Sequence, residues 1–195
     1  MKNKFRQLTK SIRQCRLCEN ELQHSPNPIF QIHPEARILI AGQAPGRKAH
    51  DSSIPFDDPS GDRLREWMGI SREIFYDATK IAILPMSFCY PGTKKSGDLA
   101  PRPECAPAWR KNILNELPKL KLTLVIGIYA IKWHLEATAK NNLTETVKSW
   151  ESYTPDIFPL PHPSPRNNIW LHKNAWYEKN VIPALRSAIA NCLND

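Results

Sequence analysis

Four short apolar runs alternate with segments of helical spacing, and this alternation restricts the fold more than any other feature. The runs are ARILIAG (36–42), KIAILPMSF (80–88), LTLVIG (122–127) and FPLPHPS (158–164). Short apolar runs that end in Gly or Pro are typical of buried strands. Strands separated by helices predict an α/β fold, a three-layer sandwich in which helices flank a central four-stranded parallel sheet. We expect residues 1–195 to form a single domain.

The segments between the runs predict helices. In chain order these are expected over 3–14, 61–77, 104–117, 128–140 and 174–191. We expect Gly69 to split the second segment and Pro183 to mark a kink or a boundary in the last. The chain has 18 Pro and only 7 Gly, so the other connections should be rigid loops.

The loops that follow the strands are where function is expected, because ligands bind at the carboxyl ends of parallel strands. These loops are GQAPG (42–46), PMSFC (85–89), GIYA (127–130) and HPSPRN (162–167). GQAPG lacks the Gly-Lys-Ser/Thr ending of a phosphate loop, and taken alone it could be an ordinary strand-to-helix turn. In HPSPRN, the prolines stiffen the backbone around His162, and Arg166 and Asn167 can contact phosphates or base edges. A lone histidine is more often structural, so the loop needs the support of a second motif.

The charge balance favours a polyanionic partner. Lys and Arg number 27 against 19 Asp and Glu, a formal net charge of +8. Arg47, Lys48 and Arg166 lie in loops at the expected functional edge, where they could contact phosphates. No apolar run reaches the roughly 20 residues that span a bilayer, and the basic N-terminus has no apolar signal segment. We therefore expect a cytoplasmic, monomeric protein with no membrane partner.

The cysteines predict a metal site. Cys15 and Cys18 form a Cys-x-x-Cys pair, and Cys89 and Cys105 lie in the Pro-rich segment after the second strand. A single Cys-x-x-Cys pair is ambiguous between zinc, redox and cluster chemistry. Four thiolates can hold a [4Fe–4S] cluster, and they can equally hold structural zinc. Cys192 fits no ligand spacing.

With GQAPG after the first strand and HPSPRN after the last, the sequence resembles the uracil-DNA glycosylase superfamily. Residues 54–64, IPFDDPSGDRL, are similar to the Pro-Phe-x4-Gly-x-x-Leu stretch of its thermophile-type, iron–sulfur branch. The cysteine pattern is similar to the cluster ligands of that branch. HPSPRN is most like the loop of the single-strand-selective monofunctional branch.

The resemblance implies a monofunctional DNA glycosylase. Such an enzyme hydrolyses the N-glycosidic bond of uracil, or of a related deaminated base, flipped out of DNA in base-excision repair. His162 would stabilise the leaving base as an anion, and Phe56 would stack on it. Gly42, Ala44 and Ser87 would complete the base pocket. The implied DNA-binding residues are Arg47, Lys48, Pro163, Ser164, Pro165, Arg166 and Asn167. Neither main motif contains a lysine nucleophile, so no strand cleavage is expected.

Three positions depart from the family pattern. Ala44 stands where the most active members carry Asp, Gln43 where the iron–sulfur branch has Glu, and Pro85 where that branch has a base-reading Asn. The expected catalytic set is therefore His162, Gln43 and Asp58, with Ser87 taking over part of the base reading. These departures also favour an alternative, a non-catalytic, metal-stabilised nucleic-acid-binding module of the same fold. An enzyme acting on free nucleosides is a third hypothesis.

Overall fold

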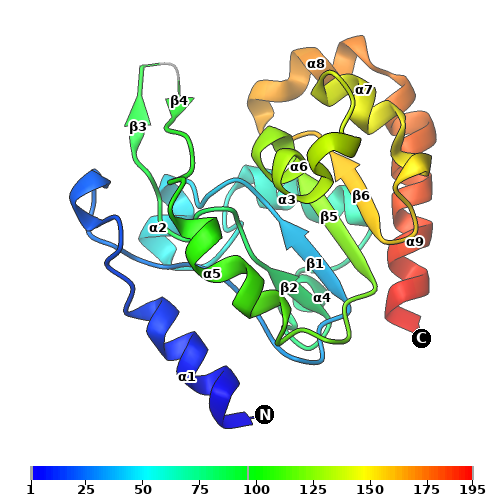
Figure 1. Cartoon of the computed structure of the whole chain (residues 1–195). Helices are drawn as coiled ribbons and strands as arrows, with labels where there is room; N and C mark the ends of the chain where they lie inside the picture. The colour runs from blue at the N-terminus through cyan, green and yellow to red at the C-terminus, as the bar shows by residue number, and fades with distance from the viewer. Residues whose placement is uncertain (1, 96, 195) are drawn as a thin grey trace.

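The computed structural model describes residues 2–95 and 97–194, and its centre is a parallel sheet of four strands (Figure 1). The strands are β1 (Ile38–Ala41), β2 (Ile81–Ile83), β5 (Leu122–Ile126) and β6 (Ile157–Leu160), in the order β2-β1-β5-β6. All three pairings are parallel, so the four carboxyl ends meet at one edge. The predicted α/β sandwich is confirmed.

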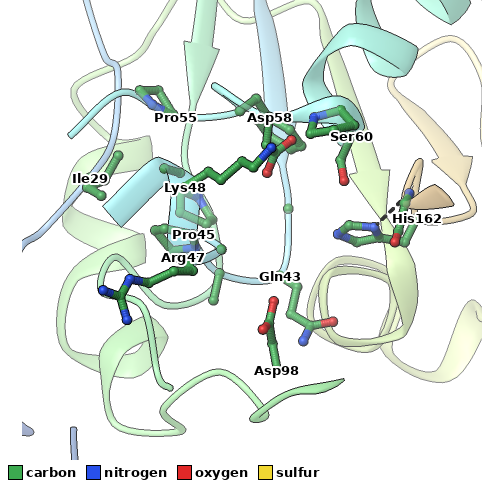
Figure 2. Close-up of a pocket in the computed structure, with 18 of the residues that line it drawn as sticks. Ile29, Gln43, Pro45, Arg47, Lys48, Pro55, Asp58, Ser60, Asp98 and His162 are labelled. Carbon is green, nitrogen blue, oxygen red and sulfur yellow. Dashed lines mark hydrogen bonds between the residues drawn. The ribbon is translucent and has the colours of Figure 1, made fainter. Parts of the chain in front are cut away.

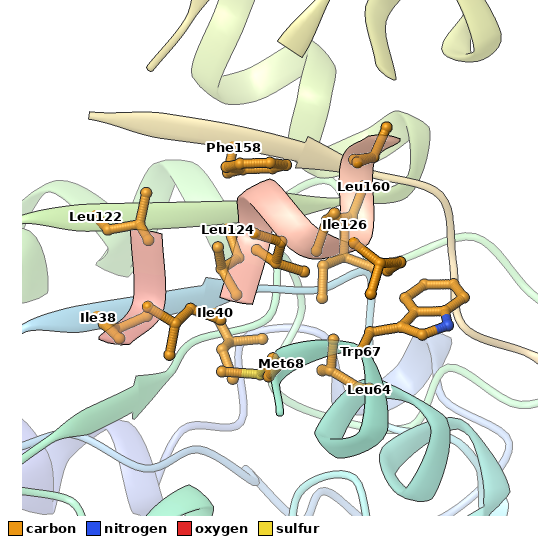
Figure 3. Packing of buried hydrophobic residues seen from close by; sticks show 14 of the residues in the cluster. Ile38, Ile40, Leu64, Trp67, Met68, Leu122, Leu124, Ile126, Phe158 and Leu160 are labelled. Atoms are coloured by element: carbon orange, nitrogen blue, oxygen red, sulfur yellow. The ribbon is translucent and has the colours of Figure 1, made fainter. Parts of the chain in front are cut away.

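Side chains of β1 alternate between the two faces of the sheet, as a strand period of two requires. Ile38 and Ile40 face the layer formed by α3 (Pro59–Met68) and α9 (Ile182–Asn194), as Figure 3 shows. Leu39 faces the opposite layer, where α1 (Lys2–Arg13) and α5 (Cys105–Leu114) pack. The sheet is therefore buried on both sides, which explains its uninterrupted apolar runs.

The remaining helices are shorter, and several lie between predicted segments. They are α2 (Arg47–Ser52), α4 (Arg72–Tyr76), α6 (Gly127–Leu135), α7 (Leu143–Lys148) and α8 (Asn168–Lys173). Single 3₁₀ turns cover Glu19–Glu21, Glu136–Thr138, Trp150–Ser152 and Pro165–Asn167, and a π-helical turn covers Tyr177–Val181. The segment predicted over 61–77 divides into α3 and α4 at Gly69, whose φ is +66°. Pro183 lies just after the π-helical turn, at the start of α9.

Two predicted strands are shorter than expected, because proline interrupts them. β2 ends at Ile83, and Pro85 has no N–H to continue the ladder. The chain nevertheless stays beside the first loop: Met86 N–H donates to the Gly42 carbonyl at 2.9 Å and Ser87 N–H to the Gln43 carbonyl at 3.1 Å. β6 ends at Leu160, before the prolines that flank His162.

A small hairpin, β3 (Thr93–Lys94) with β4 (Gly97–Asp98), rises from the connection between β2 and α5 (Figure 1). The sequence predicts only a Pro-rich loop here, because two-residue strands carry no apolar pattern. Gln23 anchors the hairpin, since its side chain donates to the Thr93 carbonyl at 3.2 Å and accepts from the Thr93 N–H at 2.9 Å. Among the described helices, none has the length and apolarity to cross a membrane.

Candidate active site

A cavity of about 380 Å³ opens at the carboxyl edge of the sheet (Figure 2). The predicted site residues that line it are Gly42, Gln43, Ala44, Arg47, Lys48, Phe56, Asp58, His162, Ser164, Pro165 and Arg166. The sequence did not single out Ser60 and Asp98, which also line it. The cavity therefore brings the neighbouring motifs at 42–46 and 54–64 together with HPSPRN (162–167), which is distant in the chain.

The aromatic wall of the cavity is Phe56, held in an unusual backbone conformation. Its φ is +56°, a region that L-residues seldom occupy. A Cβ atom added at Gly61 would lie 1.8 Å from the Phe56 carbonyl oxygen, so only glycine fits under this turn. The ring itself lies 3.3 Å from where a Cβ of Gly42 would be. The glycines of two motifs thus let the Phe56 ring approach the first loop closely.

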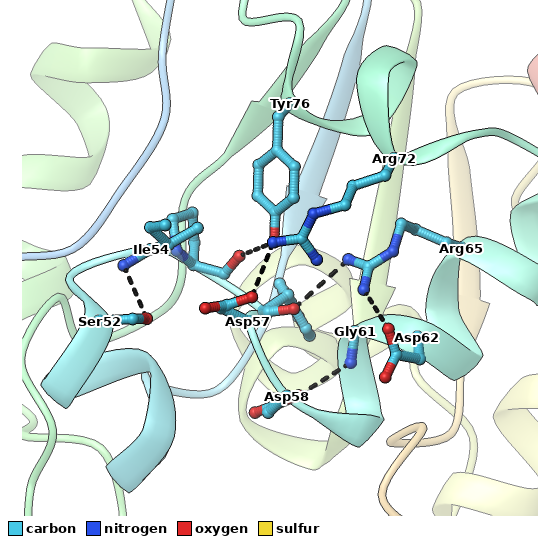
Figure 4. Close-up of polar contacts among 11 residues, drawn as sticks. Ser52, Ile54, Asp57, Asp58, Gly61, Asp62, Arg65, Arg72 and Tyr76 are labelled. Atoms are coloured by element: carbon cyan, nitrogen blue, oxygen red, sulfur yellow. Dashed lines mark hydrogen bonds and ion pairs between the residues drawn. The ribbon is translucent and has the colours of Figure 1, made fainter.

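Asp58 stabilises the turn that contains Phe56 and Gly61. Its Oδ1 accepts the Gly61 N–H at 2.8 Å and so caps the first turn of α3 (Figure 4). Arg65 supports the turn beneath, bonded to the carboxylate of Asp62 at 2.6 Å. Asp62 is thus an exposed partner of Arg65 and does not line the cavity.

His162 is fixed by its own loop. The Ser164 N–H donates to Nδ1 of His162 at 3.2 Å, and the Asn167 side chain donates to the His162 carbonyl at 2.7 Å. Arg63 donates to the Ser164 carbonyl at 3.1 Å, which ties the loop to α3. With Nδ1 accepting, a neutral ring carries its proton on Nε2.

The charge state of His162 follows from its surroundings. Burial lowers the pKa of His162 below its usual range, and the carboxylates of Asp58 and Asp98 oppose that shift. The ring is therefore neutral at pH 7, with Nε2–H available as a donor in the cavity.

The predicted DNA-binding residues divide into two groups. Arg47, Lys48, Ser164, Pro165 and Arg166 line the cavity, and all of them except Ser164 are exposed. Pro163 is buried, and Asn167 is engaged in holding the carbonyl of His162. These last two residues shape the loop rather than line the cavity.

Ser87 is not brought to the cavity. Its side chain is 1% exposed, its hydroxyl donates to the Cys89 carbonyl at 3.3 Å, and it lines a separate pocket on the cysteine side. The physical reason is the end of β2 at Ile83: beyond it the chain no longer alternates between faces, so a side chain two residues after Pro85 need not point the same way. Pro85 itself lines the cavity.

The four predicted metal ligands meet in that second pocket. It is lined by Cys15, Cys18, Cys89 and Cys105, with Pro26, Pro28, Phe88 and Trp109 among its apolar walls. The Phe88 N–H donates to Sγ of Cys105 at 3.4 Å. Burial raises the pKa of the Cys89 thiol to about 11 and that of the Cys105 thiol to about 12. Within residues 2–95 and 97–194, no group of three or more His, Cys, Asp or Glu, the four cysteines included, is placed closely enough to hold a metal ion.

Arg110 is fully buried and holds the chain just after β2. It comes from α5, donates to the carbonyls of Leu84 at 2.9 Å and Pro85 at 3.1 Å, and donates to Nε2 of His134 at 2.8 Å. Burial, and then the charge of Arg110, lower the pKa of His134 to about 3. A neutral His134 therefore accepts from the buried Arg110 guanidinium. Through its other hydrogen bonds Arg110 fixes Leu84 and Pro85, the residues that follow β2.

A comparison with the models of known protein families matches residues 29–186, more than half of the chain, to the family described as "Uracil DNA glycosylase superfamily". The matched range contains GQAPG, the stretch over 54–64 and HPSPRN, and it starts after Cys15 and Cys18. At the level of the family, this match supports a DNA glycosylase-like function and a DNA substrate. The three motifs meet in one cavity on the expected fold, and the chain belongs to the uracil-DNA glycosylase superfamily.

Proposed function

We propose that this chain is a monofunctional DNA glycosylase that removes uracil, or a related deaminated base, by hydrolysis. The observation that carries the proposal is the pairing, in one cavity, of the Phe56 ring with a neutral His162 whose Nδ1 is already occupied. A planar base needs a stacking surface, and a departing base anion needs a fixed donor.

The base would enter the cavity after leaving the DNA stack. The Phe56 ring would stack on one face of the base, and Nε2–H of His162 would donate to a ring carbonyl. The Gln43 amide, which lines the same cavity, can both donate and accept and so can read a base edge or hold a water molecule. Arg47 and Lys48 at the rim would contact the phosphates.

Bond cleavage would follow a hydrolytic course. The bond between the anomeric carbon and the base nitrogen breaks, and its electron pair passes into the base. The fixed Nε2–H of His162 stabilises the negative charge that develops on the carbonyl oxygen, without proton transfer. Water then adds to the sugar cation, which gives an abasic site and the free base.

The test is release of free uracil from single- and double-stranded oligonucleotides that contain one uracil. We expect release by the wild-type protein and an intact abasic strand as the product. Borohydride should trap no protein–DNA adduct, although Lys48 lies in the cavity. DNA binding without base release would instead support the non-catalytic module, the hypothesis that Ala44 in the first motif favours.

We further propose that Cys15, Cys18, Cys89 and Cys105 hold a [4Fe–4S] cluster. The four cysteines line one pocket with apolar walls, and a backbone N–H is directed at the Cys105 sulfur, as is common for cluster thiolates. A bound cluster would serve structure, joining the N-terminal segment to the chain between β2 and α5. Metal analysis and the visible absorption of freshly purified protein test this: iron with sulfide and a brown colour support it, and stoichiometric zinc contradicts it.

A further inference from the structure

The cavity contains two carboxylates, and their surroundings differ. Of the described residues that line it, only Asp58 and Asp98 are acids. The first motif carries no acid, since position 44 is alanine and the Gln43 amide cannot take a proton at pH 7. If the cavity hydrolyses a glycosidic bond, one of these two carboxylates is the group available to accept a proton from water.

Asp58 already has a structural task. Its Oδ1 caps α3 through the Gly61 N–H, the same turn that holds Phe56. No hydrogen bond or ion pair joins Asp98 to another side chain in the described parts of the chain, so its carboxylate is available to a ligand in the cavity.

Asp98 lines the cavity beside the first loop. A Cβ atom added at Gly46 would lie 3.8 Å from Oδ2 of Asp98 and 3.7 Å from Oδ2 of Asp58, so both carboxylates approach the first loop. The charge of Asp98 also acts on the His162 ring. In Figure 2 Asp98 and Gln43 are drawn on one side of the cavity, and Asp58 and Ser60 on the other.

The hairpin that carries Asp98 is docked and held on two sides. A Cβ atom at Gly97 would lie 2.0 Å from Nη1 of Arg166, so this glycine lets the hairpin rest directly against the HPSPRN loop. On the other side Gln23 holds Thr93, the residue paired with Asp98 across the hairpin, through two hydrogen bonds. These contacts fix the register that presents Asp98 to the cavity.

We propose that Asp98 is the catalytic carboxylate, which orients the attacking water and accepts its proton, with the Gln43 amide as the second contact to that water. The inference rests on the proposed function. The water oxygen forms the new bond to the anomeric carbon of the sugar cation that remains once the bond to the base has broken. The electron pair of the broken bond leaves with the base, and one water proton passes to Asp98. That proton later returns to solvent or to the departed base, so the carboxylate is regenerated.

The test compares Asp98→Asn with Asp58→Asn and with Glu151→Gln, an exposed acid that does not line the cavity. Asn at position 58 keeps an acceptor for the Gly61 N–H. We expect Asp98→Asn to lower the single-turnover rate of uracil release by about 10²–10⁴-fold, the usual contribution of a general base. Its affinity for uracil-containing DNA should stay within about threefold of the wild type, and Asp58→Asn should lose less than about tenfold in rate.

The possible outcomes separate failure of this inference from failure of the proposed function. An active wild type with an Asp98→Asn rate within about threefold of it overturns the inference and leaves the proposed function standing. A wild type that releases no base from either substrate overturns both. Should Asp98→Asn fail to melt cooperatively, Asp98→Glu replaces it: a retained carboxylate should keep a rate that Asp98→Ala loses, and equal rates for these two variants contradict the proposal.

Discussion

The cavity and the cysteine pocket lie on either side of one stretch of chain, and they differ in what they expose. The cavity is open and is lined by charged, polar and apolar side chains, whereas the cysteine pocket has apolar walls, with Cys89 and Cys105 buried and Cys15 and Cys18 partly exposed. Both draw on residues 85–105: Pro85 and Asp98 line the cavity, and Cys89 and Cys105 line the pocket. The connection between β2 and α5 therefore contributes residues both to the candidate active site and to the pocket of the four cysteines.

The largest expected effect is on metal content and thermal stability. Cys105→Ser removes one of the four sulfurs and should abolish bound iron. Because metal binding contributes directly to folding, we expect the melting temperature of the loaded protein to fall by roughly 10 °C, or about 3–5 kcal/mol. Iron content and thermal melting measure this. Cys192→Ser, outside the pocket, is the matched control and should change neither. Equal iron content and equal melting temperatures of the two variants would contradict a special role of Cys105 in metal binding.

The second expected effect is on the rate of uracil release, which should depend on the cavity and not on the cysteine pocket. His162→Ala removes the donor that faces the cavity and should lower the rate of uracil release by about 10²–10³-fold, the usual effect of deleting one such donor. Iron content should stay at the wild-type level. Single-turnover assays and metal analysis on the same preparation measure both. A His162→Ala protein that loses its metal would show that the two sites are not separate in function.

A third, smaller effect concerns the buried pair between the sites. The His134 pKa falls to about 3 in the folded chain, so between that value and the usual 6.5 the unfolded chain binds a proton that the folded chain does not. Stability is then fully present above pH 6.5 and declines as pH falls, by up to about 1.4 kcal/mol per pH unit. Between pH 6.5 and 5, the wild type should lose about 2 kcal/mol more than His134→Gln. Denaturant unfolding at the two pH values measures the difference, and parallel curves would contradict it.

Much of the fold and part of the site could be predicted from sequence, because the signals are local. The Ile and Leu residues of β1 and the prolines around His162 act within a few residues of themselves. Asp98 could not be predicted, because its place depends on a two-residue strand and on the contact of Gly97 with Arg166. The orientation of Ser87, away from the cavity, could not be predicted either, because β2 ends at Ile83 and the chain beyond it does not follow strand alternation. Contacts between distant segments decide such positions, and the sequence alone does not display them.

The smallest expected effect separates the charged rim of the cavity from the rest of the basic surface. Arg47→Ala should reduce the slope of log affinity for DNA against log salt by about 1, because one phosphate contact is lost. Lys119→Ala removes the same charge before β5, at the opposite edge of the sheet, and should leave the slope unchanged.

Arg47 also offers a test in the other direction, because it already binds Asp51 through a contact of 2.9 Å. Asp51→Asn would release the guanidinium for a phosphate and should strengthen DNA binding slightly, while Arg47→Ala leaves the Asp51 carboxylate unpaired near the rim and weakens it. Titrations at several salt concentrations measure both variants. Equal slopes for Arg47→Ala and Lys119→Ala would mean that the excess positive charge attracts DNA over the whole surface. The basic residues at the cavity rim would then contribute no more to DNA binding than other surface cations.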